Sequence, residues 1–143
     1  MAVNQLSVFI ENREGRLEEV TSILANEQVN IVTLSLADTA EYGMLRMIVS
    51  EPEKAKDALK AAGFVAKLTP VLAIKVPNCA GMLQKILHTV AEAGCNVEYM
   101  YILSTGANAS VIVKASDVEK AQEAMKNAGI ELYDAEEVYN FVS

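Results

Sequence analysis

One segment occurs twice in this chain. The stretches "EGRLEEVTSILANEQVN" (residues 14–30) and "AGMLQKILHTVAEAGCN" (residues 80–96) each place a Gly before an apolar stripe and an Asn 15 residues after that Gly. A shift of 66 residues, the distance from Gly15 to Gly81, aligns further identical residues without a gap. The sequence therefore predicts two copies of one supersecondary unit.

Each copy has the order strand, helix, strand, strand, helix, strand. Alternating apolar residues predict first strands at Gln5–Ile10 and Val71–Val76. Last strands are expected at Phe64–Thr69 and within Ile130–Val142. This is the ferredoxin-like plan, an α+β fold with an antiparallel sheet and both helices on one face. We expect domains at residues 1–69 and 70–143, side by side and joined by "TPV".

The ends of the second helices also carry signals. Ser50-x-x-Glu53 and Ser116-x-x-Glu119 predict capping boxes, in which the Ser accepts a bond from the first helical turn. Gly63 and Gly129 are expected to end these helices in the left-handed conformation.

Composition limits the classes of function. The 143 residues are 52% hydrophobic, which indicates a folded core, and no apolar run approaches the ~18 residues of a membrane span. The start of the chain does not read as a signal peptide. A net charge of −7 argues against binding to nucleic acid or a membrane surface. Two cysteines and a single histidine predict a reduced, cytoplasmic protein without metal, cofactor or catalytic triad.

The glycine loops are the candidate ligand sites. A loop that ends in Gly at a helix start presents backbone N–H groups at the positive end of the dipole, which suits a carboxylate. We expect the second strand to start beside this loop, bringing its Asn amide within reach. The candidates are Asn12, Arg13, Glu14, Gly15, Arg16, Leu17, Asn30 and Ile31 in the first copy, and Asn78, Cys79, Ala80, Gly81, Met82, Leu83, Asn96 and Val97 in the second. A purely structural role of the Gly and Asn residues, in turns, is the alternative.

Both copies resemble the ACT domain, a small amino-acid-sensing module. The resemblance rests on "ENREGRL" with "VNIVTLSL" and on "VPNCAGML" with "CNVEYMYI". It implies a regulatory protein that binds a free amino acid at the seam between the units and acts on an enzyme or protein partner. Two copies use up the chain, so no catalytic domain is expected. A ligand-free interaction module and a small enzyme on the same scaffold are the alternatives.

The two faces of each sheet predict a homodimer. We expect one set of residues to face the helices: Leu6, Val8, Leu34, Leu36, Leu45 and Met47. Alternation then exposes an apolar second face made of Phe9, Ile31, Met44 and Ile48, and of Ala73, Val97, Tyr99, Tyr101 and Ile112 in the second copy. An apolar face of this extent predicts contact with another sheet.

Overall fold

A computed structural model of the chain describes residues 2–38, 42–77, 79–104 and 109–141. These residues form two compact units. The N-terminal unit consists of Asn4–Thr69 with residues 139–141, and the C-terminal unit consists of residues 70–138 with residues 2 and 3. How the units sit side by side stays a prediction.

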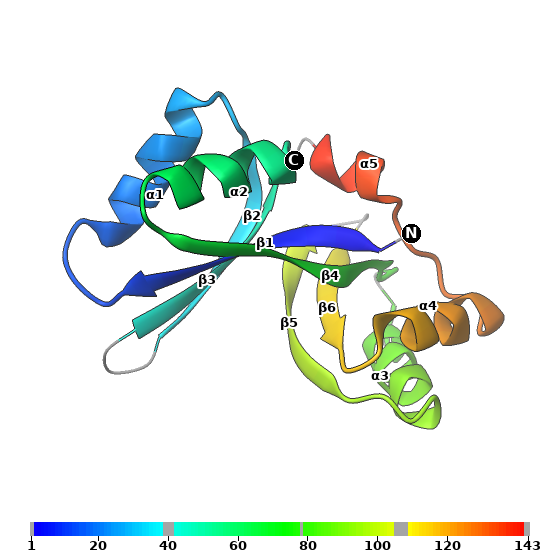
Figure 1. Cartoon of the computed structure of the whole chain (residues 1–143). Helices are drawn as coiled ribbons and strands as arrows, with labels where there is room; N and C mark the ends of the chain where they lie inside the picture. Colours follow the sequence, from blue (N-terminus) through cyan, green and yellow to red (C-terminus); the bar gives the residue numbers. More distant parts are fainter. Residues whose placement is uncertain (1, 39–41, 78, 105–108, 142–143) are drawn as a thin grey trace. The chain divides into compact units, whose positions relative to one another are not determined.

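The N-terminal unit has the expected βαββαβ order. Its elements are β1 (Val3–Glu11), α1 (Arg16–Asn26), β2 (Ile31–Asp38), β3 (Tyr42–Val49), α2 (Pro52–Ala61) and the first part of β4 (Val65–Lys75). The strands lie in the order β2-β3-β1-β4, and β3 pairs antiparallel with both β1 and β2. Both helices cover one face of these strands (Figure 1). The predicted fold class is confirmed for this unit.

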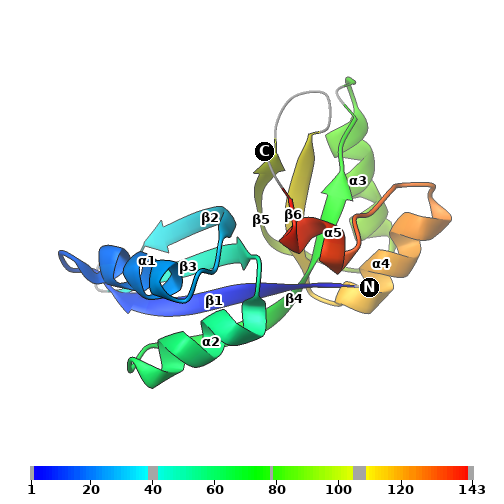
Figure 2. The same cartoon turned by 90° about the horizontal axis from the view of Figure 1, so that it is seen from above.

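The C-terminal unit repeats the plan. After the second part of β4 come α3 (Met82–Glu92), β5 (Val97–Ser104), β6 (Ser110–Ala115) and α4 (Val118–Asn127). The strand order is β4-β6-β5, with antiparallel pairing throughout. Both helices again lie on one side of the strands (Figure 2). The "TPV" segment lies inside β4, so the two strands expected on either side of it form one continuous strand.

The last predicted strand of the C-terminal unit is wrong. Among the described residues of this segment, pairing with β4 is limited to an isolated bridge between Ile74 and Leu132. The chain then enters a short helix, α5 (Ala135–Tyr139). The Asp134 N–H donates to the Glu137 carboxylate at 3.2 Å, which is half of a capping box. The helix thus begins where the predicted strand would have continued.

Each unit has its own hydrophobic core between the sheet and the helices. In the N-terminal unit this core contains the predicted residues Leu6, Val8, Leu45 and Met47, all fully buried. Val20 and Leu24 of α1 pack against them. The corresponding core of the C-terminal unit includes Ile86 and Val90 of α3, and Cys95. The apolar helical stripes therefore face the sheet as the sequence predicts.

Strict alternation fails at the start of β2 and of β5. Ile31 and Val97 were predicted on the outer face, but both pack against the helix-side cores. The register of β2 shifts between Ile31 and Thr33, and that of β5 shifts between Val97 and Tyr99. Such an irregularity moves a side chain to the other face of the sheet.

Burial also corrects the predicted faces. Leu34 and Leu36 pair with Met47 and Leu45, which places them on the helix side, yet each is 45% exposed because β2 is an edge strand. On the outer face, the prediction of exposure is wrong for three residues that are buried: Ile48, Ala73 and Ile112. Phe9 remains 42% exposed there.

The predicted serine caps are wrong, whereas the glycine stops are confirmed. The N-cap of α2 is Glu51, and that of α4 is Asp117, whose carboxylate accepts from the Lys120 N–H. Both helices end at a left-handed Gly, with φ of 92° at Gly63 and 73° at Gly129. The N–H of the residue after each Gly bonds back into the last helical turn, as in a Schellman motif.

Candidate functional site

The two glycine loops have the same backbone geometry. Gly15 and Gly81 are the N-caps of α1 and α3, with φ of 81° and 90°. A Cβ added at either position would meet no atom within 4 Å, so the left-handed dihedral, and not crowding, requires glycine. Both glycines are exposed, and the N–H of the first residue of each helix bonds within its own loop, to the carbonyl three residues before it at 3.4 Å.

A small cavity lies beside the N-terminal loop. Its volume is about 80 Å³, and its walls are Ile10, Glu11, Asn12, Arg13, Leu17, Leu36 and Gly43. It brings together three of the predicted residues, Asn12, Arg13 and Leu17, with the later part of β2 and the start of β3. Arg13 pairs with Glu11 at 3.1 Å in an exposed ion pair.

Asn30 and Asn96 lie elsewhere in their units. The Asn30 N–H donates to Ser50 Oγ at 2.9 Å, and the Asn96 N–H donates to Ser116 Oγ at the same distance. Each Asn follows an 11-residue helix that starts at the glycine loop. Such a helix is ~16 Å long, and Figure 1 shows the chain entering β2 at the far end of α1.

The expectation that the second strand starts beside the glycine loop is therefore wrong within a unit. The helix reverses the chain direction, so it is the end of β2 that returns to the loop. Ile31 and Val97 directly follow Asn30 and Asn96 as the first residues of β2 and β5, so they also start their strands away from the glycine loops.

The remaining predicted residues divide by exposure. Glu14, Cys79, Ala80 and Leu83 are exposed, and Asn78 lies outside the described residues. Arg16 is half-buried, with its guanidinium 4.4 Å above the Phe64 ring and 2.7 Å from Glu19. Its counterpart Met82 is also half-buried and lines a larger cavity.

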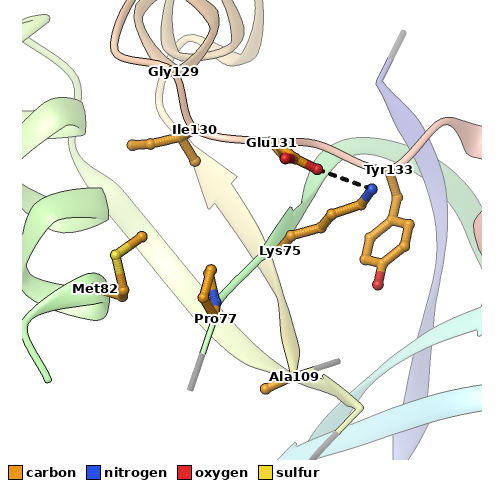
Figure 3. Close-up of a pocket in the computed structure, with 8 residues that line it drawn as sticks. All are labelled: Lys75, Pro77, Met82, Ala109, Gly129, Ile130, Glu131 and Tyr133. Carbon is orange, nitrogen blue, oxygen red and sulfur yellow. Dashed lines mark hydrogen bonds and ion pairs between the residues drawn. The ribbon is translucent and has the colours of Figure 1, made fainter. Parts of the chain in front are cut away.

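This larger cavity lies in the C-terminal unit and has a volume of about 220 Å³. Its walls come from the end of β4, the start of α3, the chain just before β6 and the segment after α4. They are formed by Lys75, Pro77, Met82, Ala109, Gly129, Ile130, Glu131 and Tyr133. Figure 3 shows Lys75 reaching toward Glu131 and Tyr133, with Met82, Ile130 and Pro77 on the other side.

One charged pair lies in the wall of this cavity. Lys75 Nζ is 3.3 Å from Glu131 Oε2 and 4.9 Å from the centre of the Tyr133 ring. The hydrogen bond to Glu131 raises the pKa of Lys75 above its usual value, against a smaller opposing effect of burial. Lys75 is thus an ammonium ion at neutral pH, and the cavity offers both signs of charge.

The sequence interpretation missed Lys75, Glu131 and Tyr133. A signal was present, because the 66-residue shift sets Lys75 against Phe9 and Glu131 against Val65. Two apolar residues of one copy thus correspond to a charged pair in the other.

Metal-binding clusters and membrane-spanning helices are two features that would change the interpretation of the site. In the described ranges, no cluster of three or more His, Cys, Asp or Glu side chains could hold a metal ion. Within the same part of the chain, no helix is both long and apolar enough to cross a membrane.

The chain belongs to the ACT domain pair family, whose model matches residues 1–142. It is similar to protein BT0572 from Bacteroides thetaiotaomicron, with 40% identity over 99% of this chain and 98% of that one and a TM-score of 0.93. It shares its fold with the ligand-free regulatory subunit of aspartate kinase from Thermus thermophilus (21% identity, 89% and 93% of the two chains, TM-score 0.64). The subunit from Thermus flavus is similar at 22% identity, 90% and 94% coverage and a TM-score of 0.61. No curated protein matches the chain.

Proposed function

We propose that this protein is a regulatory protein that binds a free amino acid and has no catalytic activity of its own. The observation that carries the proposal is the pair of left-handed glycine N-caps, each opening a helix in an ACT domain. The first-turn N–H groups of such a helix bind a carboxylate. The fold shared with a regulatory subunit supports a role in controlling a partner enzyme or protein.

The loop residues Asn12–Leu17 and 79–83 are the proposed contacts of the ligand. The second loop has fewer charged side chains to compete with a ligand, since Cys79, Ala80 and Met82 stand where the first has Arg13, Glu14 and Arg16. The Ile31 and Val97 side chains pack against the cores, whereas Asn30 and Asn96 stay candidates through their side-chain amides, at the ends of α1 and α3 away from the loops. The cytoplasm stays the predicted compartment.

A melting screen against the twenty common amino acids tests this function. A ligand that binds only the folded state raises its stability, by ~2.7 kcal/mol at a hundred times its Kd. We expect at least one amino acid to raise the melting temperature at millimolar concentration. If none does, the ligand-free interaction module replaces the sensor as the better proposal.

Calorimetric titration with the amino acid found in that screen tests the individual residues. If the Asn96 amide binds a charged group of the ligand, Asn96→Ala removes a bond of ~1.5–3 kcal/mol, which weakens binding at least about tenfold. Asn30→Ala is the matched variant in the other copy. Unchanged affinity in both variants would remove the Asn residues from the site.

A further inference from the structure

The geometry points to the cavity of the C-terminal unit as a binding site for a zwitterionic amino acid with an apolar side chain. In this arrangement the ligand carboxylate contacts Lys75 Nζ, its ammonium contacts the Glu131 carboxylate, and its side chain packs toward Met82 and Ile130. The inference rests on the proposed function for its ligand class, and it places that ligand in the cavity beside the C-terminal glycine loop, which Met82 at the start of α3 lines.

The charged wall suits both ends of a zwitterion. Lys75 and Glu131 form a pair 3.3 Å apart, with side chains that are 36% and 75% exposed. Exposed ion pairs of this kind are weak, so a ligand that carries both charges can replace the contact with two of its own. The Lys75 ammonium lies over the face of the Tyr133 ring, 4.9 Å from its centre, which is a favourable cation–π contact.

The opposite wall is apolar. Pro77, Met82, Ala109 and Ile130 line it, and Met82 is the one flexible side chain among them. The volume of about 220 Å³ corresponds to the space of ~7 water molecules of ~30 Å³ each. That is room for a free amino acid, and the absence of further charge on this wall favours an aliphatic or thioether side chain.

The N-terminal copy shows that these residues are not required by the fold. Strand registers match across the shift of 66 residues, because Phe9 pairs with Met44 and Lys75 pairs with Ser110. Arg16 and Phe64 stand where the C-terminal unit has Met82 and Ile130, and the guanidinium stacks on the ring at 4.4 Å. The same position thus carries a stacked pair in one copy and the wall of a cavity in the other. We therefore expect one ligand per chain.

The test is calorimetric titration of the full chain with L-leucine and L-methionine as probes. We expect one molecule bound per chain, with affinity lowered at least tenfold by Lys75→Met and by Glu131→Gln. Met82→Arg, which introduces the residue of the other copy, should abolish binding. Lys75→Arg keeps the positive charge and should retain binding. Lys56→Met is the control: it breaks an ion pair with Glu53, 2.9 Å away on α2 of the N-terminal unit, and should leave affinity unchanged.

Two analogues separate the charged contacts. 4-Methylpentanoate lacks the ammonium of leucine, so Glu131→Gln should not change its affinity. 3-Methylbutylamine lacks the carboxylate, so Lys75→Met should not weaken its binding. If either apolar amino acid binds but ignores both variants, the cavity assignment is overturned and the proposed function stands. If only charged or polar amino acids bind, the assignment is overturned as well. If none of the twenty common amino acids binds, both proposals fail.

Discussion

At one pair of equivalent positions, the two copies adopt the same left-handed backbone conformation with different residues. The turn after α1 places Gln28 at φ 58°, and the turn after α3 places Gly94 at φ 77°. In both, the next N–H bonds back to the helix, from Val29 to the Leu24 carbonyl and from Cys95 to the Val90 carbonyl. The left-handed conformation strains a residue with a side chain by roughly 1–2 kcal/mol, and glycine avoids this strain.

We predict that Gln28→Gly stabilises the N-terminal unit. Relief of strain is partly offset by the greater freedom of glycine in the unfolded chain, roughly 0.5–1 kcal/mol, so the net gain should be about 0.5–1 kcal/mol. Urea denaturation measures it. Gln28→Ala is the control, because alanine has the same Cβ and should bring no gain. Equal stabilisation by both variants would contradict the conformational explanation.

Sequence patterns predict some of these residues and not others. Gly15, Gly63, Gly81 and Gly129 could be placed at turns because glycine marks left-handed backbone. Gln28 carries no such mark, because its conformation is imposed by the bonds around it. Lys75 and Glu131 lie 56 residues apart and meet only through the bridge of Leu132 to β4, which no local pattern indicates.

At the scale of elements, the serines predicted as helix caps accept hydrogen bonds at the starts of two strands instead. Ser50 Oγ and Ser116 Oγ each accept from the N–H of an Asn just before β2 or β5, at 2.9 Å. Pro52, at the start of α2, has no N–H to be capped. Element order and type could be predicted from periodicity, but the bulges and these side-chain bonds depend on neighbouring strands that the local sequence does not specify.

The two second helices provide a matched test of capping. The Asp117 carboxylate accepts from the Lys120 N–H at 3.1 Å, whereas Glu51 makes no such side-chain bond in the described part of the chain. We predict that Asp117→Ala destabilises the protein by about 1 kcal/mol, while Glu51→Ala changes little. Thermal and urea unfolding of both variants measure the difference. A loss of equal size in the two variants would show that general charge effects, and not the cap, are responsible.

At the scale of the whole molecule, duplication has preserved the fold and varied its surfaces. The cores of the two units come from equivalent positions, such as Leu6 with Leu72 and Met47 with Val113. Exposed and cavity-lining positions differ between the copies, as at Phe9 and Lys75. The constraint of packing acts on both copies alike, so the fold could be predicted from the repeat. The surfaces carry no such constraint, so the cavity of the C-terminal unit could not be predicted from the repeat.

We predict that the protein is a homodimer in which the outer sheet face of the N-terminal unit takes part. Phe9 and Tyr42 are 42% and 43% exposed, and their rings stack with centroids 4.8 Å apart. Phe9 pairs with Met44 on that face. Exposed aromatic clusters of this kind are typical centres of protein interfaces.

Light scattering at micromolar concentration should give twice the monomer mass of 15.5 kDa. The double variant Phe9→Ser with Tyr42→Ser should shift the equilibrium toward the monomer, because it removes the aromatic surface that association would bury. Leu87→Ser is the control, since Leu87 is similarly exposed, at 37%, but lies on α3 of the other unit. A monomer mass for the unmodified protein would refute the dimer. A dimer that both variants leave intact would move its interface away from Phe9 and Tyr42.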